Sequence, residues 1–495
     1  MVNLKWKGKN KIKNLLLEAN QIEPFHILDI YPSIGTEPDE NEKWQNQLIW
    51  GENKVVMTSL LKNFENKITL IYIDPPFATG GDFNLKIQIG EDGNSVDEIA
   101  YKDKWKEGLD TYLNFLYERL IVMKNLLADN GSIYIHLDWH ISHYVKLIMD
   151  EIFGINNFRN EIIWAYPAAS VKSRRFFIRS YDTILFYSKS DDCIFNNDPN
   201  IYMEYSDRVK KALKEDERGV FYYRGGSHNG KKLSRKVYVE KKGIFPRDVW
   251  NDIPYIRANT SEYQGFSTQK PERLLKRIIL ASTNPSDLVA DFFCGSGTTL
   301  AVAEKLGRNW IGCDNNRQAI HLSRKRILKI KSSNDILNWN KKYDKNLQPF
   351  KILGVEGQGT QQSIPEGFLI EDTKNEEILK TQEPPKFSLE IQQSEKTVRV
   401  KLIDYKNPYE KFISREIRKN IISFSDWIDF WAIDYDFNNQ IFNNAWFSCR
   451  TPKNRKLMLN SKPYLYTKPG NYNLAIKLVD ILGLVTQKSY KIQVL

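Results

Sequence analysis

Two short motifs contain residue types that could carry out chemistry. The first, Asp74-Pro75-Pro76-Phe77, directly follows the apolar, β-branched run Ile68–Ile73. Its prolines remove two backbone donors and stiffen the loop, which leaves hydrogen-bond acceptors and one aromatic face. A carboxylate and a neighbouring carbonyl can accept both N–H bonds of a weakly nucleophilic ring amine, and Phe77 can stack on that ring. An isolated Asp-Pro-Pro is equally consistent with a rigid turn, so the loop needs support from its surroundings.

The second motif, Asp291–Thr299, contains the glycine turn Gly295-Ser296-Gly297 between an apolar run and a helix-forming segment. Glycines let a backbone approach a ligand closely, and Asp314, which ends the next apolar run, can accept bonds from ribose hydroxyls. The dinucleotide fingerprint would need a third glycine where Leu300 stands, and no Gly-Lys-Ser/Thr of a P-loop follows. The pattern therefore predicts a cofactor turn of another class.

Both motifs require a sheet that brings strand ends together. Apolar runs predict buried strands at residues 68–73, 131–138, 288–293 and 310–313. Helical spacing of apolar residues predicts helices at residues 55–61, 109–127, 274–281 and 298–306, and a polar gap is expected at 78–93. Strands that alternate with helices indicate an α/β fold, in which ligands bind at the carboxyl ends of parallel strands.

A basic segment separates the two motifs. Residues 165–260 hold 19 Lys and Arg against 12 Asp and Glu, a net charge of +7 out of +11 for the 495-residue chain. The stretch from Asn196 to Gly243 is polar and rich in loop residues. A basic lobe beside an active-site loop predicts contact with nucleic acid.

Cysteine usage and hydropathy exclude several other classes. The four cysteines have no CxxC spacing, which argues against zinc modules and disulfide frameworks, and no metal is expected. Neither a signal peptide nor an apolar run long enough to span a membrane is present. We expect a cytoplasmic protein without a membrane partner.

Taken together, Asp74–Phe77 and Asp291–Thr299 resemble the catalytic and cofactor motifs of the β-class amino-group DNA methyltransferases. The catalytic motif precedes the cofactor motif here, as it does in that class. Further matches are residues 48–53, 119–120, 131–138, 153–154 and 268–271. The resemblance implies a Rossmann-like S-adenosylmethionine-dependent methyltransferase fold with a circularly permuted motif order, an inserted recognition lobe and a C-terminal β-rich domain.

The same resemblance implies roles for individual residues. The catalytic residues would be Asp74, Pro75, Pro76 and Phe77. S-adenosylmethionine would be bound by Asp291, Phe293, Gly295, Ser296, Gly297, Thr298 and Asp314, with Lys270 and Pro271 beside it. His136, Asp138 and Cys294 lie in or near these motifs and are read as structural.

The expected substrate is double-stranded DNA. Cytosine-N4 enzymes of this family more often carry Ser at the position of Asp74, so the chain is expected to methylate adenine N6 at a specific site. Cytosine-N4 methylation and a catalytically inactive DNA-binding subunit stay as alternatives. Cytosine-C5 chemistry is rejected because the chain contains no Pro-Cys nucleophile. A restriction endonuclease or another defence-system subunit, and a second copy of the chain, are expected as partners.

Six regions are expected along the chain. They are a leader at 1–44, a catalytic half at 45–170, a target-recognition region at 171–262, a cofactor half at 263–330, a linker at 331–386 and a β-rich accessory domain at 387–495. Residues 425–431, 469–472 and 479–481 within the last region resemble small immunoglobulin-like modules of the polycystic-kidney-repeat type.

Overall fold

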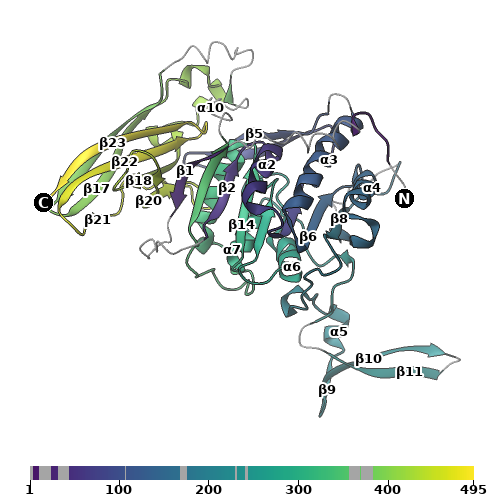
Figure 1. The fold of residues 1–495 in the computed structure, drawn as a ribbon. Coiled ribbons are helices and arrows are strands. Elements are labelled where there is room, and N and C mark those ends of the chain that lie inside the picture. Colours follow the sequence, from purple (N-terminus) through teal and green to yellow (C-terminus); the bar gives the residue numbers. More distant parts are fainter. Residues whose placement is uncertain are drawn as a thin grey trace.

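A mixed sheet forms the centre of the molecule (Figure 1). The computed structural model describes residues 4–9, 24–31, 44–105, 108–167, 175–228, 231–239, 243–355, 368–369 and 383–495, and within them the sheet has 11 strands. Their order is β12 (Val249–Trp250), β7 (Phe158–Ala165), β8 (Tyr181–Ser188), β6 (Leu127–Leu137), β3 (Ile68–Ile73), β13 (Leu288–Asp291), β14 (Asn309–Asp314), β2 (Asn46–Trp50), β15 (Phe350–Val355), β1 (Phe25–Tyr31) and β19 (Phe442–Asn443). The six strands from β6 to β15 in this order run parallel, so their carboxyl ends share one edge.

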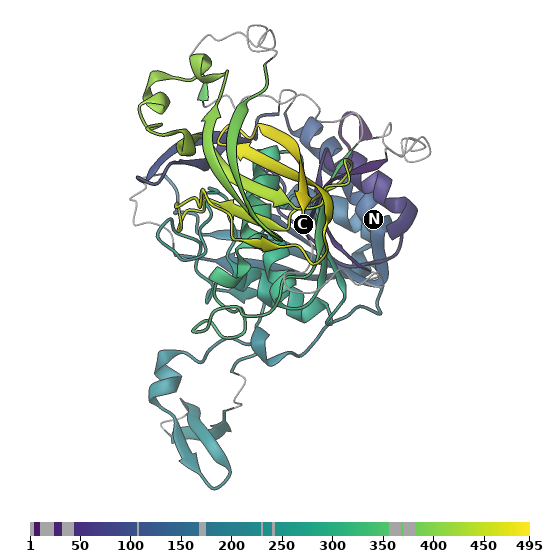
Figure 2. The same ribbon diagram turned by 90° about the vertical axis from the view of Figure 1, so that its left-hand side faces the viewer.

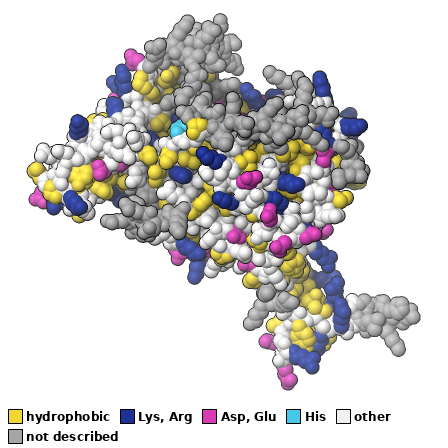
Figure 3. Space-filling model, in the orientation of Figure 1, with side chains coloured by type: hydrophobic (Ala, Val, Ile, Leu, Met, Phe, Trp, Pro, Cys, Tyr) yellow, Lys and Arg dark blue, Asp and Glu magenta, His cyan; other side chains and the backbone are white. Residues whose placement is uncertain are grey.

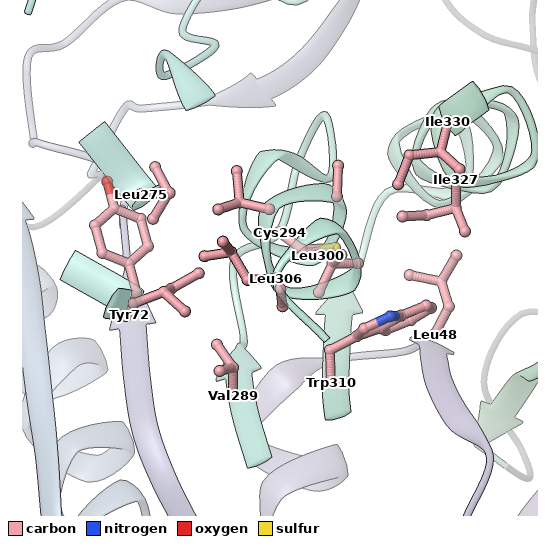
Figure 4. Close-up of a cluster of buried hydrophobic side chains, with 14 of the residues drawn as sticks. Leu48, Tyr72, Leu275, Val289, Cys294, Leu300, Leu306, Trp310, Ile327 and Ile330 are labelled. Carbon is pink, nitrogen blue, oxygen red and sulfur yellow. The ribbon is translucent and has the colours of Figure 1, made fainter. Parts of the chain in front are cut away.

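Helices cover both faces of this sheet. One face packs against α2 (Asn53–Phe64), α3 (Leu109–Leu126) and α4 (Ser142–Phe153). The other packs against α6 (Glu272–Ser282), α7 (Thr298–Lys305) and α8 (Arg317–Leu328). Figure 4 shows part of this second core, where Cys294 lies among apolar side chains together with Leu300 and Trp310. Burial raises the pKa of the Cys294 thiol well above its usual value, in keeping with a structural role. The α/β fold class expected from the sequence is confirmed.

The structure differs from the sequence-based outline in three segments. The expected gap after the first motif forms an antiparallel hairpin of β4 (Asp82–Ile89) and β5 (Asn94–Lys102), because Leu85, Ile87 and Ile89 are buried against other elements. Parts of the expected leader and linker form β1 and β15, which pair with each other and extend the central sheet. Most of the rest of the leader, and residues 356–367 and 370–382 of the linker, lie outside the described residues, and the six region boundaries stay predictions.

Two β-rich parts are attached to this core. The lobe contains the short helix α5 (Asp207–Lys211) and a sheet of β9 (Lys214–Asp216), β10 (Gly219–His228) and β11 (Lys231–Tyr238), which projects away from the core (Figures 1 and 2). The C-terminal part contains α10 (Arg415–Arg418) and the strands β16 (Lys386–Ser394), β17 (Thr397–Lys406), β18 (Ile428–Asp434), β20 (Trp446–Cys449), β21 (Tyr464–Leu465), β22 (Gly470–Asp480) and β23 (Val485–Val494). Its β-rich nature was expected from the sequence. No helix in the described part of the chain has the length and apolar character needed to cross a membrane.

Candidate active site

The loop that follows β3 presents one carboxylate at the carboxyl edge of the sheet. Oδ2 of Asp74 accepts a hydrogen bond from the ammonium group of Lys270. Its other oxygen, Oδ1, is buried and has no hydrogen-bond partner among the described residues. A buried acceptor without a donor is costly, so this oxygen marks a position where the donor of a ligand would be favourable.

Asp103, immediately after β5, fixes the far side of this loop. Its completely buried carboxylate accepts hydrogen bonds from the backbone N–H groups of Ala78, at 2.9 Å, and Thr79, at 2.7 Å. Ala78 has a φ of 56°, a left-handed conformation that a non-glycine residue adopts only when its surroundings enforce it. The loop is therefore held in shape before any substrate arrives.

An aromatic and polar cluster lies beneath Phe77. The ring of Phe77 is nearly parallel to His136, with centroids 6.2 Å apart and an interplanar angle of 16°. His136 is fully buried, and its Nδ1 and Nε2 lie 3.0 Å from the Tyr72 hydroxyl and the Asp182 carboxylate, respectively. Burial, together with nearby Asp74, raises the pKa of Tyr72 well above its usual value, so its hydroxyl stays protonated. Although burial opposes it, the hydrogen bond with His136 lowers the pKa of Asp182, so this carboxylate accepts from Nε2–H. These hydrogen bonds fix the imidazole beside the ring of Phe77.

The glycine turn begins where β13 ends. Asp291 accepts hydrogen bonds from the backbone N–H of Phe293, at 3.0 Å, and from the Thr299 hydroxyl. Asp314, at the end of β14, accepts the N–H of Gly295 at 2.9 Å. Burial raises the pKa of Asp291 to about 7 and that of Asp314 to about 6. A cation bound beside these carboxyls would favour their charged forms, so the site is suited to a positively charged ligand.

Gly297 has a packing role in the structure, and its predicted contact with the cofactor stays a prediction. It caps the amino end of α7 with a φ of 70°, and a Cβ atom added there would come within 2.7 Å of the Ser323 hydroxyl on α8. The glycine thus permits close packing of α8 behind the turn. Arg326, also on α8, reinforces this packing by donating to the Ser296 carbonyl and the Thr298 hydroxyl.

One cavity of about 610 Å³ joins the two motifs. Its wall includes nine of the residues singled out from the sequence, namely Asp74, Pro76, Lys270, Asp291, Phe293, Gly295, Ser296, Thr298 and Asp314. The other four lie outside this wall: Pro75, Phe77, Pro271 and Gly297. The structure therefore brings the predicted catalytic carboxylate and the predicted cofactor turn to one cavity, although 216 residues lie between Asp74 and Asp291 at the end of β13.

Other residues of the wall were not predicted as site residues. Glu52 and Asn53 follow β2 and are held by Arg119 of α3, whose guanidinium donates to both side chains. The strand-end sequence from residue 48 to 53 was a usable signal for this part. Leu482 and Gly483, near the carboxyl end of the chain, also line the cavity, and no local pattern singled them out.

The cavity fits S-adenosylmethionine in volume and in chemistry. Its volume lies in the range of small-molecule sites, and its acidic side chains match the positive charges of a sulfonium and an ammonium group. Asp314, the residue that the sequence predicts to bind the ribose, lies beside the glycine turn in the cavity wall. Lys270 offers a positive charge for a carboxylate, at the end of the cavity where Asp74 lies.

The sequence of this chain is similar to those of known proteins. A family model described as "DNA methylase" matches residues 68–325, just over half of the chain, and spans both motifs. The type II methyltransferase M.EcaI of Enterobacter cloacae is 31% identical over 325 residues, which cover 57% of this chain and 69% of that protein. The DNA adenine methyltransferase YhdJ of Escherichia coli (strain K12) is 30% identical over 294 residues, covering 59% and 86% of the two chains. The crystal structure of the M1.HpyAVI-SAM complex matches 57% of this chain and 98% of its own, with 18% identity and a TM-score of 0.34.

Proposed function

Because this chain belongs to the DNA methylase family, we propose that it transfers a methyl group from S-adenosylmethionine to the N6 amino group of adenine at specific sites in duplex DNA. The observation that carries this proposal is the buried Oδ1 of Asp74, an acceptor without a donor in the cavity that also contains the glycine turn. An amino group of the substrate supplies the missing donor. The adenine would leave the DNA stack to reach the cavity, as in other enzymes that modify bases.

In the proposed reaction, the protein orients the amino group of adenine and does not need a strong base to deprotonate it first. Bound S-adenosylmethionine supplies an electrophilic methyl group on its sulfonium. Asp74 Oδ1 accepts one N–H of adenine N6 and the Pro75 carbonyl accepts the other, which directs the nitrogen lone pair toward the methyl carbon. As the N–C bond forms, the C–S bond breaks and sulfur keeps the electron pair. The methylated nitrogen then loses one proton, for which the Asp74 carboxylate is the nearest acceptor.

The choice of adenine rests on the residue at position 74. The resemblance described above associates Asp at this position with adenine N6 and Ser with cytosine N4, and the relative YhdJ is named as an adenine methyltransferase. The face of Phe77 is the proposed stacking surface for the flipped base, and His136 holds that ring in its plane. Stacking on Phe77 suits either base, so the choice of adenine rests on Asp74.

The projecting lobe is the proposed target-recognition element. On its hairpin, Arg224 and Arg235 are exposed and directly opposite each other on β10 and β11. Like charges in this position repel each other, so a polyanion bound between them would be stabilising. Figure 3 shows further Lys and Arg side chains along the projecting lobe. A two-stranded ribbon of this kind fits the major groove of B-DNA.

Methylation of DNA by the purified protein tests the proposed function directly. The protein is incubated with S-adenosylmethionine labelled in its methyl group and with mixed-sequence duplex DNA, and the digested nucleosides are identified by mass spectrometry. We expect N6-methyladenine. N4-methylcytosine would overturn the choice of base, and cofactor binding without any transfer would favour the inactive-subunit alternative.

The variant Asp74→Ala tests whether Asp74 acts on the target amine. We expect transfer to fall by at least about a thousandfold, because the oriented acceptor is lost, while the Kd for S-adenosylmethionine stays within about threefold of the unchanged protein. Activity is measured by label transfer and affinity by calorimetry. An equal loss of both quantities would contradict the assignment of Asp74 to the target amine.

The recognition element is tested by exchange. Residues 171–262 are replaced by the corresponding segment of a relative with a different recognition sequence, and modified-base sequencing then gives the methylated site. We expect the recognition sequence to follow the segment while the chemistry stays adenine-N6. If the site followed residues 387–495 in a parallel exchange, the C-terminal domain would be the recognition element.

The expected partners belong to the same proposal. A relative named as the probable type III restriction-modification enzyme HindVI Mod subunit supports a restriction endonuclease or another defence-system subunit as partner, and two copies of the chain are expected to associate. A chromosomal DNA substrate would place the protein in the cytoplasm, at the nucleoid. Light scattering and co-purification from the source cell measure the two associations.

A further inference from the structure

Part of the cavity wall is built by the C-terminal domain, which is far from Asp74 in the sequence. The turn between β22 and β23 contributes Leu482 and Gly483 to the wall, next to Arg317 and Gln318 at the start of α8. Packing is close there, because a Cβ atom added to Gly483 would lie 2.8 Å from Nε2 of Gln318. A domain outside the matched family region thus reaches the candidate cofactor site.

The chemistry of the ligand decides which of its parts lies at this turn. The sulfonium must be near Asp74, where the methyl group is transferred, and the ribose is assigned to Asp314. Since the ribose lies between the sulfur and the purine, the purine extends past Asp314, toward the residues that follow it. These are Asn315 to Gln318, which line the cavity together with Leu482 and Gly483.

This turn is rigidly held within its own domain. The buried Asp480 accepts the backbone N–H groups of Leu482 and Leu484 on Oδ1, at 3.0 and 2.8 Å. Its Oδ2 accepts the Tyr405 hydroxyl and the Asn407 amide, at 2.8 and 2.7 Å. Four donors on one carboxylate fix the turn in place. Leu482 is only 2% exposed and packs in the core of its own domain, so it presents a fixed apolar edge to the cavity.

Buried charges fix α8 to the same domain. Asp429 of β18 accepts hydrogen bonds from His321, at 2.6 Å, and from Lys325, at 2.5 Å, and all three side chains are less than 10% exposed. The neighbouring face of α8 supports the glycine turn, because Ser323 donates to the Gly295 carbonyl at 2.9 Å. The helix therefore connects the C-terminal domain to the cofactor turn.

The β4–β5 hairpin forms a second connection. Its residues Leu85 and Ile87 pack in one apolar cluster with Phe266 and with Trp427 of the C-terminal domain. Its strand β5 also lines the cavity, and the Ala100 carbonyl accepts a 2.7 Å hydrogen bond from the side chain of Asn316. The cavity wall near the expected purine is thus held from two sides by the C-terminal domain.

We propose that the C-terminal β domain completes the cofactor site, with Leu482 packing against the purine of S-adenosylmethionine and Gly483 leaving room for Gln318 beside it. This inference rests on the proposed function for the identity of the ligand. It assigns the domain a role in cofactor affinity in place of an independent DNA-binding or recruiting role.

The full-length protein tests this with Leu482→Ala and the matched control Leu484→Ala. Leu484 lies in the same turn and is 1% exposed, against 2% for Leu482, but it is not part of the cavity wall. Calorimetry gives the Kd for S-adenosylmethionine, S-adenosylhomocysteine and adenosine. We expect Leu482→Ala to weaken all three by about tenfold, since each contains the purine, and Leu484→Ala to change none.

Kinetics separate this role from a general structural one. In Leu482→Ala the KM for S-adenosylmethionine should rise about tenfold while kcat at saturating cofactor stays unchanged. The more conservative Leu482→Met, which keeps the buried volume, serves if the alanine variant does not fold, and a two- to threefold rise in Kd is expected. Unchanged Kd values for a folded Leu482 variant would overturn the inference, and so would a loss of kcat without a change in KM.

The two proposals fail in distinguishable ways. If the unchanged protein binds S-adenosylmethionine but transfers no methyl group to DNA, the proposed function is wrong, while the Kd comparison still tests the role of Leu482. If the unchanged protein does not bind S-adenosylmethionine or adenosine, both proposals are wrong.

Discussion

The projecting lobe and the C-terminal domain are both β-rich attachments to the same core, but their charged residues are placed in opposite ways. In the lobe, the ion pair between Lys236 and Asp216 has side chains that are 43% and 25% exposed. In the C-terminal domain, the ion pair with α8 between Lys325 and Asp429 has side chains that are 9% and 6% exposed. The ion pair of the lobe is exposed to water, whereas this ion pair of the domain is buried against the core.

This difference separates the part that we propose binds DNA from a part that belongs to the scaffold. Exposed charges remain available to a polyanion and add little to stability. Buried charges are desolvated and must stay paired, so they fix one arrangement of two elements. Strand β19 joins the central sheet beside β1, which ties the C-terminal domain to the core by backbone hydrogen bonds as well. The lobe forms its own three-stranded sheet.

The largest effect is expected from Asp429→Ala, which breaks the buried attachment. His321 and Lys325 would lose their acceptor in a buried place, and the free energy of unfolding should fall by about 3–5 kcal/mol. Asp216→Ala in the lobe is the matched control, and its unfolding free energy should stay close to that of the unchanged protein. Urea denaturation measures both variants. Equal effects would remove the distinction between the two regions.

A smaller effect, on DNA affinity alone, is expected from the double variant Arg224→Ala/Arg235→Ala. Loss of two phosphate contacts should lower the slope of log K against log salt by about 2, without lowering Tm, because a like-charged pair is removed. Arg399→Ala/Lys401→Ala, on an exposed face of β17, is the control and should leave the slope unchanged. Salt titrations of DNA binding by fluorescence anisotropy provide the measurement. A loss of Tm with an unchanged slope would assign the arginines to folding.

The smallest expected effect is on how steeply the free energy of unfolding falls as the pH is lowered. Burial, with the Arg324 charge adding to it, lowers the pKa of His321 to about 3, whereas an unfolded His titrates near 6.5. Between these values the unfolded chain binds a proton that the folded chain does not, so the stability due to neutral His321 is present above pH 6.5 and is lost as the pH falls. His321→Gln should reduce the acid-dependent loss of unfolding free energy by up to about 1.4 kcal/mol per pH unit.

Urea denaturation at pH 7, 6 and 5 measures this slope for the unchanged protein and the variant. The buried Asp291 and Asp480, whose pKa values burial raises to about 7, change stability in the opposite sense, but they are common to both proteins. Exposed His143→Gln is the control and should leave the slope unchanged. An equal slope in all three proteins would show that His321 is protonated in the folded state.

Local sequence patterns predicted many of the strands and helices of the core correctly. The strand predicted at residues 68–73 has these bounds in the structure, and the helix predicted at 109–127 lies at 109–126. The β4–β5 hairpin was missed, although Leu85, Ile87 and Ile89 alternate as in a strand, because its turn residues resemble those of a loop and its apolar face is covered by distant elements. The strand β15 was missed for the same reason, since its pairing partners β1 and β2 lie hundreds of residues away.

The sequence alone determined the chemistry of each motif: an acceptor loop after a buried strand, a glycine turn between strand and helix, and an acid at the next strand end. These features depend on neighbouring residues, on the steric limits of proline and glycine, and on hydrophobic periodicity. Only the tertiary structure decided that Lys270 pairs with Asp74, that Gly297 faces Ser323, and that Leu482 reaches the cofactor cavity. Such contacts depend on which faces are buried together when distant segments pack, and no local pattern encodes that.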